Sequence, residues 1–227
     1  MKDSHRLTRS REDYLKALYA LDGASHAVTV GELARRLCVS PPSATNMLDR
    51  LAREALVTRA RRGEARLTGP GKRRALDTLR RHRLLETFLV SVLGLDWAEA
   101  HEDAEVLEHG VSDRVLAAIE KLLEFPTEDP HGHPIPDRHG RLPRRALVSL
   151  VSIPQGHRAV VREIRDRDQR RMTRWKQSGL VPGAEVRMRE ANLEDDVFEV
   201  EVAGRRIVAG SEGLDGILVE RRRAGRP

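Results

Sequence analysis

The sequence predicts a mainly α-helical protein that carries a small β domain at its C-terminal end. Over roughly the first 70 residues, helix caps and apolar residues at helical spacing mark three short helices, and an alternating stretch follows them. Residues 73–124 contain few helix breakers, whereas apolar and polar residues alternate in short runs after residue 146. A chain of 227 residues can hold two or three small domains, and we expect them at 1–72, 73–143 and 144–227.

Three helix starts define the first domain. Ser10 is expected to cap the first helix, because serine oxygens accept hydrogen bonds from the free amides of a first turn. Thr29 and Glu32 form the capping-box pattern of a second helix. Ser40 then caps a third helix, with Pro41 at the first helical position, where a missing N–H has no cost.

Two helices joined by a tight turn and followed by a β-hairpin have the pattern of a winged helix-turn-helix. The hairpin is the alternating stretch LVTRARRGEARLT, whose tip is basic. In this motif the third helix places short polar side chains in the major groove, and arginines contact phosphates. The alternative is that the prolines only start a helix and the arginines form a solvated face. We favour double-stranded DNA binding, through Ser40, Pro42, Ser43, Thr45, Asn46, Arg50, Arg53, Arg59, Arg61 and Arg62.

Composition favours a polyanionic partner inside the cell, either nucleic acid or an anionic membrane face. Lys and Arg outnumber Asp and Glu by 41 to 35, which favours a polyanionic ligand. Only 3% of residues are aromatic, which argues against a protein that stacks single-stranded bases. No apolar run approaches the roughly 20 residues of a membrane span, and no signal peptide is evident. The single cysteine, Cys38, is expected to be a small buried residue, so we expect a cytoplasmic protein without membrane association.

The second and third domains follow from helix breakers and β periodicity. One long helix is expected over 70–92, a second from Asp96 to about His109, and a third from 112 or 113 to about 124. The segment FPTEDPHGHPIPDRHGRLP is expected to be an irregular connector. Five or six short strands and one helix, from about Asp168 to Ser178, then predict a small barrel-like domain.

Carboxylate and imidazole side chains recur at helical spacing in three places. His82 and Glu86 are one turn apart, and Asp13 lies in the first turn of the first helix. A further group faces one side of the second long helix: His101, Glu105, Glu108 and His109. Pairing the two central helices antiparallel would bring the His and Glu faces together, as in helical-bundle metal sites. Oxygen and nitrogen ligands without a thiolate suit Mn²⁺ or Fe²⁺, and Zn²⁺ or Co²⁺ by affinity order.

Each of these residues has an alternative explanation. Asp13 could belong to a capping-box-like turn, and a single histidine or glutamate is usually a surface or core residue. A metallohydrolase is the rival function, but it needs an open coordination position and a general base. No HExxH or nucleophile motif is present, and an enzyme would leave the winged helix-turn-helix unexplained. We therefore interpret the cluster as a metal sensor attached to a DNA-binding head.

The chain resembles the diphtheria-toxin-repressor-like (iron-dependent repressor) regulators, and within them the manganese-responsive members. The resemblance covers essentially the whole chain and rests on EDYLKALY, VTVGELARRLCVSPPSATNMLDRL, RRHRLLETFLVSVLGLDW, HEDAEVLEHGVSD and DPHGHPIP. It implies a winged helix-turn-helix, a helical metal-binding and dimerisation domain and a C-terminal SH3-like domain. It also implies a homodimeric repressor that binds a palindromic operator when loaded with Mn²⁺ and controls metal-uptake genes. An Fe²⁺-responsive repressor of iron homeostasis remains the alternative.

The resemblance also implies ligands by position. The primary site would use Asp13, Glu105, Glu108 and His109, and the ancillary site His82, Glu86 and His101. Further ligands from the third domain would be Asp166, Asp168 and Gln169.

The same positions indicate the metal. Iron-type members have Met in place of Asp13 and Cys in place of Glu105, so the carboxylates here favour Mn²⁺, with Zn²⁺, Co²⁺ or Cd²⁺ as substitutes in vitro. Lys16 stands where binuclear manganese regulators have a ligating Glu. An ammonium cannot ligate a metal and repels a second cation, so two separate sites are expected.

Overall fold

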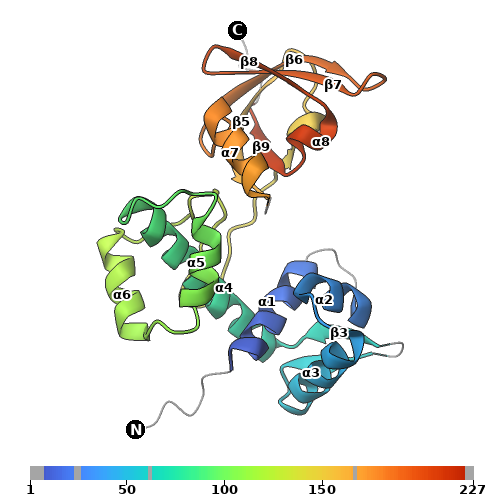
Figure 1. Ribbon diagram of the computed structural model, residues 1–227, viewed down its shortest axis with the longest axis vertical. Helices are drawn as coiled ribbons and strands as arrows, with labels where there is room; N and C mark the ends of the chain where they lie inside the picture. Colours follow the sequence, from blue (N-terminus) through green and yellow to red (C-terminus); the bar gives the residue numbers. More distant parts are fainter. Residues whose placement is uncertain (1–7, 23–26, 61–62, 166–167, 223–227) are drawn as a thin grey trace. The chain divides into compact units, whose positions relative to one another are not determined.

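The computed structural model describes residues 8–22, 27–60, 63–165 and 168–222 (Figure 1). The chain forms two compact units. The first takes in residues 1–82, 107–112 and 136–142, and the second residues 83–106, 113–135 and 143–227. The helical segment predicted as one domain is therefore divided between them. Within the described ranges, none of the helices combines the length and the hydrophobicity needed to cross a lipid bilayer.

Three helices and a small antiparallel sheet make up the N-terminal part of the first unit, which is blue to cyan in Figure 1. The helices are α1 (Arg9–Asp22), α2 (Val30–Leu37) and α3 (Pro41–Arg53). The strands β1 (Val28–Thr29), β2 (Val57–Arg59) and β3 (Glu64–Leu67) pair in the order β1-β3-β2. Their shared core is dominated by fully buried leucines, among them Leu15, Leu18, Leu33, Leu48 and Leu51. The predicted winged helix-turn-helix is present, and β1 is a strand that the sequence did not predict.

The predicted caps of the second and third helices are confirmed. Thr29 and Glu32 form a complete capping box, and Ser40 accepts a hydrogen bond from the Ser43 amide ahead of Pro41. The predicted cap of the first helix is wrong, because α1 already begins at Arg9 and Ser10 lies inside its first turn.

Cys38 is exposed, contrary to the prediction. It follows α2 as the C-cap in the left-handed conformation, with φ 53°, and its Sγ lies 3.9 Å from the Arg35 carbonyl oxygen.

Three further helices follow: α4 (Gly69–Ser91), α5 (Ala100–Leu107) and α6 (Asp113–Leu122). α5 is shorter than predicted at both ends. Asp96 accepts a hydrogen bond from the Ala98 amide in a separate turn before α5, and Glu108 and His109 lie in the turn after it. The predicted connector is irregular apart from one isolated β-bridge between Glu128 and Pro134.

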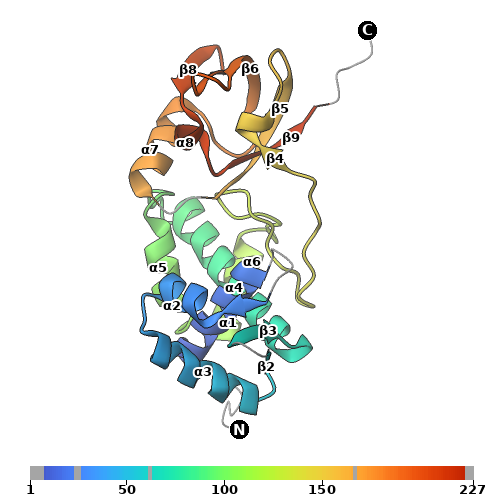
Figure 2. The same cartoon turned by 90° about the vertical axis from the view of Figure 1, so that its right-hand side faces the viewer.

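The C-terminal part of the second unit is one antiparallel sheet in the order β4-β9-β5-β6-β7-β8. Its strands are β4 (Val148–Ser149), β5 (Arg158–Ile164), β6 (Glu185–Asn192), β7 (Val197–Val202), β8 (Arg205–Ala209) and β9 (Ile217–Arg221). The short helix η1 (Leu150–Ser152), α7 (Gln169–Ser178) and α8 (Ser211–Leu214) complete it (Figure 2). As predicted, α7 follows Asp168 and ends at Gly179. Trp97 and Ala98, from the turn before α5, belong to the same hydrophobic core as this sheet.

A glycine at the start of α4 is required by close backbone packing in the first unit. A Cβ added to Gly71 would lie 1.9 Å from the carbonyl oxygen of Leu56, a distance that no side chain tolerates. We expect Gly71→Ala to lower the free energy of unfolding by about 1–3 kcal/mol, measured by denaturant unfolding of the full chain. Gly31→Ala in α2, where a Cβ meets nothing within 4 Å, is the control and is expected to be neutral or mildly stabilising. Equal effects of the two substitutions would contradict this packing.

Candidate metal centre and nucleic-acid interface

The start of α3 presents a polar surface suited to the DNA major groove. Pro42, Ser43 and Asn46 are exposed on one side of the helix. The Ser40 hydroxyl is used as the N-cap, and the half-buried Thr45 hydroxyl donates to the Pro41 carbonyl at 3.0 Å. Few polar groups at this end of α3 are therefore available to contact DNA bases. Among them, the side-chain amide of Asn46 can form two hydrogen bonds with adenine.

The predicted phosphate-contacting arginines differ in how they are held. Arg50 and Arg53 are exposed near the C-terminal end of α3. Arg59, on β2, is half-buried, and its Nε lies 3.4 Å from Asp49 Oδ1. Arg61 and Arg62, at the predicted tip of the hairpin, lie outside the described residues.

Three carboxylate–imidazole clusters occur in the described part of the chain, and in each the candidate ligand atoms lie within 4.8 Å of one another. We call them the Asp13 cluster (Asp13, Glu108 and His109), the His82 cluster (His82, Glu86 and His101) and the Asp129 cluster (Asp129, His131 and His133).

The Asp13 cluster joins α1 to the turn that follows α5, within the first unit. His109 Nε2 lies 3.0 Å from Asp13 Oδ1 and 3.3 Å from Glu108 Oε1. Both His109 Nε2 and Asp13 Oδ1 are buried, so each atom has the other as a neighbour in place of water. In the metal-free chain the protonated Nε2 donates to Asp13, and a neutral Nε2 could bind a cation together with the same carboxylate oxygen once that proton is released. The donors are oxygen and nitrogen only, as Mn²⁺ or Fe²⁺ prefers.

Glu12, which precedes Asp13 on α1, orients the histidine of this cluster. Its Oε2 lies 2.6 Å from His109 Nδ1 and accepts the hydrogen bond. With Nδ1 protonated in this way, Nε2 is left as the ligand atom, which is the usual arrangement behind a metal-bound histidine. Burial lowers the pKa of His109, but the contacts with Asp13 and Glu12 and the charge of Glu108 raise it to about 9.

Glu108 is the most enclosed carboxylate of the Asp13 cluster, with a side-chain exposure of 0%. Lys16 Nζ, one turn along α1 from Asp13, donates to its Oε1 at 2.5 Å. His82 Nδ1, from α4, lies 2.7 Å from its Oε2. Arg81 is also buried and donates from Nε to the Glu108 backbone carbonyl at 3.1 Å.

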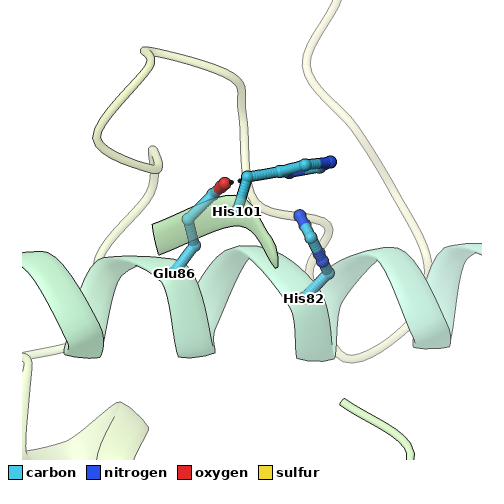
Figure 3. Close-up of side chains that lie close together, drawn as sticks. All are labelled: His82, Glu86 and His101. Carbon is cyan, nitrogen blue, oxygen red and sulfur yellow. Dashed lines mark hydrogen bonds and ion pairs between the residues drawn. The ribbon is translucent and has the colours of Figure 1, made fainter. Parts of the chain in front are cut away.

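The His82 cluster is centred on α4. His82 and Glu86 are one helical turn apart, and His101 Nδ1 of α5 lies 3.2 Å from Glu86 Oε1. Figure 3 shows His82 and Glu86 on the same side of α4, with the imidazole of His101 above them. Two imidazoles and one carboxylate are again ligands for a divalent transition metal.

The remaining predicted ligands lie apart from these clusters. Glu105 is placed beside His101, with 3.6 Å between Oε1 and Nε2, and not among the grouped atoms of the Asp13 cluster. Asp168 caps α7 by accepting from the amides of Arg170 and Arg171, and Gln169 Nε2 donates to Glu102 at 3.3 Å. Asp166 lies outside the described residues.

The Asp129 cluster lies in the connector after α6, and none of its residues is among the ligands predicted from the sequence. The Asp129 carboxylate accepts from the amides of His131 and His133, both at 2.9 Å, and lies 3.1 Å from His133 Nδ1. Arg83 Nε is 3.5 Å from the same carboxylate. The alternating Asp-x-His-x-His pattern in DPHGHPIP was the available signal, because clustered histidines are typical of metal sites.

His131 connects this cluster to the rest of the second unit. Its Nε2 donates to the Trp97 carbonyl at 2.9 Å, and its ring stacks on that of Trp97 with centroids 5.0 Å apart. Its Nδ1 therefore faces Glu86, at 3.6 Å from Oε2. Burial lowers the pKa of His131, but the Glu86 carboxylate, the charge of Asp129 and the Trp97 carbonyl together raise it above its ordinary value. Glu86, a member of the His82 cluster, thus also contacts His131 of the Asp129 cluster.

Comparison with known proteins identifies three consecutive family models along the chain. The model described as "Iron dependent repressor, N-terminal DNA binding domain" matches residues 6–65. The model described as "Iron dependent repressor, metal binding and dimerisation domain" matches residues 68–137. The FeoA domain model, which describes an SH3-like β domain, matches residues 148–221.

Relatives and solved structures agree with these matches. The iron-dependent repressor IdeR of Mycobacterium leprae (strain TN) is 33% identical over 192 residues, which cover 79% of this chain and 84% of the relative. A manganese-dependent transcriptional repressor in complex with manganese is 35% identical with a TM-score of 0.86, covering 93% of this chain and 100% of that one. ScaR with bound Cd²⁺ is 32% identical with a TM-score of 0.79, covering 93% and 99% of the two chains.

The hydrogen bond between Glu12 and His109 gives a prediction for metal affinity. Glu12→Ala is expected to weaken Mn²⁺ binding by about 10–100-fold, because the imidazole loses the carboxylate that orients it, and Glu12→Gln by less. Isothermal titration calorimetry of the full chain measures this. Asp77→Asn removes a carboxylate of α4 that is exposed and serves as the control. Similar losses in Glu12→Ala and Asp77→Asn would contradict the orienting role.

The raised pKa of His109 gives a second prediction. With a pKa of about 9, the imidazole is protonated at neutral pH in the metal-free chain, whereas a metal requires it neutral. Mn²⁺ affinity is therefore expected to rise from pH 6.5 to 9, with about one proton released per ion at pH 7.5. Protonation of His109 also stabilises the metal-free fold. This contribution to the free energy of unfolding is fully present below pH 6.5, the pKa of the unfolded chain, and is lost as pH rises through about 9. Calorimetry in buffers of different ionisation enthalpy counts the protons, and none released would refute the assignment.

Proposed function

Because this chain belongs to the iron-dependent repressor family of DNA-binding transcriptional repressors, we propose that Mn²⁺ activates it and that it binds a palindromic operator as a homodimer. The metallohydrolase alternative is excluded by the family, whose members are repressors and not enzymes. We propose metal-uptake genes as the targets and the cytoplasm as the location.

The Asp13 cluster is the observation that carries the choice of metal. Its ligand atoms are carboxylate oxygens and an imidazole nitrogen, with no sulfur atom among them. Hard oxygen ligands favour Mn²⁺ over softer metals. Fe²⁺ remains the second candidate, because relatives of this chain are named iron-dependent repressors. Neighbouring structures with Cd²⁺ and Zn²⁺ support these two ions as substitutes in vitro. Co²⁺ is proposed as a further substitute from the affinity order of divalent metals.

The position of the cluster suggests how the metal acts on the DNA-binding helices. Asp13 belongs to α1, whose Leu15 and Leu18 are in the same core as α2 and α3. Glu108 and His109 belong to the turn that connects α5 to α6. A divalent ion held by all three would fasten this turn to the DNA-binding head. In the metal-free chain the Asp13 and Glu108 carboxylates lack that ion, and the turn is less firmly attached.

The helical segment has the surface for a homodimer. Large apolar side chains are exposed at the end of α4, on α5 and along α6: Val92, Leu93, Val106, Leu107, Val115, Leu122 and Phe125. Exposed apolar groups of this number on neighbouring elements are typical of an interface. They lie in or beside the region matched by the metal-binding and dimerisation model. Two copies would present two α3 helices to successive major grooves, which requires a palindromic operator.

A second ion would bind at one of the two clusters that Glu86 contacts. We propose the His82 cluster as its position, with the Asp129 cluster as the competing one. His101→Gln is expected to remove one Mn²⁺ per chain, counted by native mass spectrometry, and His133→Gln is expected to leave the count unchanged. The reverse result would place the second ion at the Asp129 cluster.

Metal-dependent operator binding is the central test. Gel-shift titrations on the upstream regions of the gene itself and of metal-transporter genes are expected to show at least about tenfold tighter binding with Mn²⁺ than with chelator. Asp13→Asn is expected to lose most of this difference, because it removes the ligand on α1, and Asp77→Asn is expected to keep it. Equal affinity of the wild type with and without metal would overturn the function proposed.

The same assay under anaerobic conditions separates the two metals. At matched free concentrations, Mn²⁺ is expected to support operator binding at lower concentration than Fe²⁺. The opposite order would make the chain an iron sensor with the same mechanism.

A further inference from the structure

The ion pair between Lys16 and Glu108 is the feature of the Asp13 cluster that metal ligation does not explain. Lys16 Nζ lies 2.5 Å from Glu108 Oε1, and the two side chains are 15% and 0% exposed. The opposite oxygen of the carboxylate is occupied by His82 Nδ1, at 2.7 Å. A cation therefore already contacts the most buried carboxylate of the cluster before any metal binds.

A buried carboxylate requires such a partner. Taking a charge out of water is costly, and removing one partner of a buried pair is strongly destabilising because the other charge is left uncompensated. Lys16 is attached to α1, so its ammonium is present whatever the metal concentration of the surroundings. A metal ion in the same place would leave when the free metal falls.

The charges of the cluster indicate how many ions it can take. Glu12, Asp13 and Glu108 supply three negative charges within contact distance of His109 or of one another. Lys16 returns one positive charge to these carboxylates, which leaves two negative charges with a neutral imidazole, and the buried Arg81 guanidinium on the Glu108 carbonyl reduces the negative potential further. One divalent ion neutralises these two charges. A second divalent ion would create an excess of positive charge next to the ammonium and would be repelled.

We propose that Lys16 is a built-in counter-cation, which holds the metal-free Asp13 cluster together and limits it to a single divalent ion. This inference rests on the proposed metal-sensing function. In the metal-free state Lys16 holds the Glu108 carboxylate in place. In the metal-bound state it limits the number of ions that the cluster can bind. Because the ammonium shares Glu108 with the ion, it also weakens the binding of that ion. The Asp13 cluster therefore binds Mn²⁺ less tightly than the same ligands would without the ammonium.

Lys16→Met removes the charge and retains most of the side-chain length. The metal-free chain is expected to melt roughly 5–10 °C lower, because Glu108 loses its counter-charge. Mn²⁺ is expected to bind at least about tenfold tighter, because no ammonium competes for Glu108. The Mn²⁺-induced rise in Tm is therefore larger in the variant than in the wild type. Lys121→Met, which removes an exposed charge of the same sign on α6, is the control.

Lys16→Glu tests the limit on the number of ions, because it supplies an extra carboxylate in place of the ammonium. Native mass spectrometry is expected to find one additional Mn²⁺ per chain, and electron paramagnetic resonance a spin-coupled pair that the wild type lacks. Lys16→Arg keeps the charge and is expected to retain the wild-type count. Circular dichroism of each variant establishes that it is folded, and Lys16→Gln replaces Lys16→Met if the latter is not.

The outcomes separate this inference from the function on which it rests. If Lys16→Met changes the metal-free Tm and Mn²⁺ affinity no more than Lys121→Met does, Lys16 is not a counter-cation. If Lys16→Met lowers the stability of the metal-free and metal-bound chains equally, the ion pair is structural only and the inference is again overturned. Failure of the wild type to bind Mn²⁺ would overturn the proposed function, while the metal-free Tm would still test the counter-cation.

Discussion

The carboxylate of Glu108 has no exposure to solvent, and the first unit is arranged around the need to compensate its charge. Lys16 approaches it from α1 and His82 from α4, while the buried Arg81 holds the backbone carbonyl of the same residue. Three segments far apart in the sequence are therefore fixed by one side chain. The requirement is electrostatic, since an ionised group inside a protein persists only where charges and hydrogen bonds replace water. Glu108 therefore joins α1 and α4 to the turn after α5 by contacts that the leucine core of the N-terminal helices does not provide.

Local signals predicted most of the fold. The capping box at Thr29, the cap at Ser40 and the glycine end of α7 depend on residues within one turn, so sequence spacing was sufficient. The predicted start of α1 was wrong because the backbone carbonyl of Thr8, and not a side chain, accepts hydrogen bonds from the first amides of the helix. The two-residue strand β1 was not predictable, because it forms only by pairing with β3, more than thirty residues later.

Three of the four residues predicted as ligands of the primary site lie together in the structure, whereas Glu105 lies beside His101, and the contacts that support the cluster were not predicted. Asp13, Glu108 and His109 stood out by residue type and helical position. The pairs that hold them, Lys16 with Glu108 and Glu12 with His109, span 92 and 97 residues, and no periodicity reports such distances. The Asp129 cluster was missed for a different reason. Its histidines alternate in a loop, where neither helical nor strand periodicity draws attention to them.

Both tryptophans of the chain, Trp97 and Trp175, belong to the hydrophobic core that the β-sheet shares with the turn before α5. Trp97 is in ring contact with His131, and the DNA-binding head contains no tryptophan. Tryptophan fluorescence, excited at wavelengths that tyrosine does not absorb, therefore reports on the second unit alone and needs no engineered label. The optical properties of the native chain thus distinguish events in the second unit, which contains the Asp129 cluster, from events in the three N-terminal helices and their sheet.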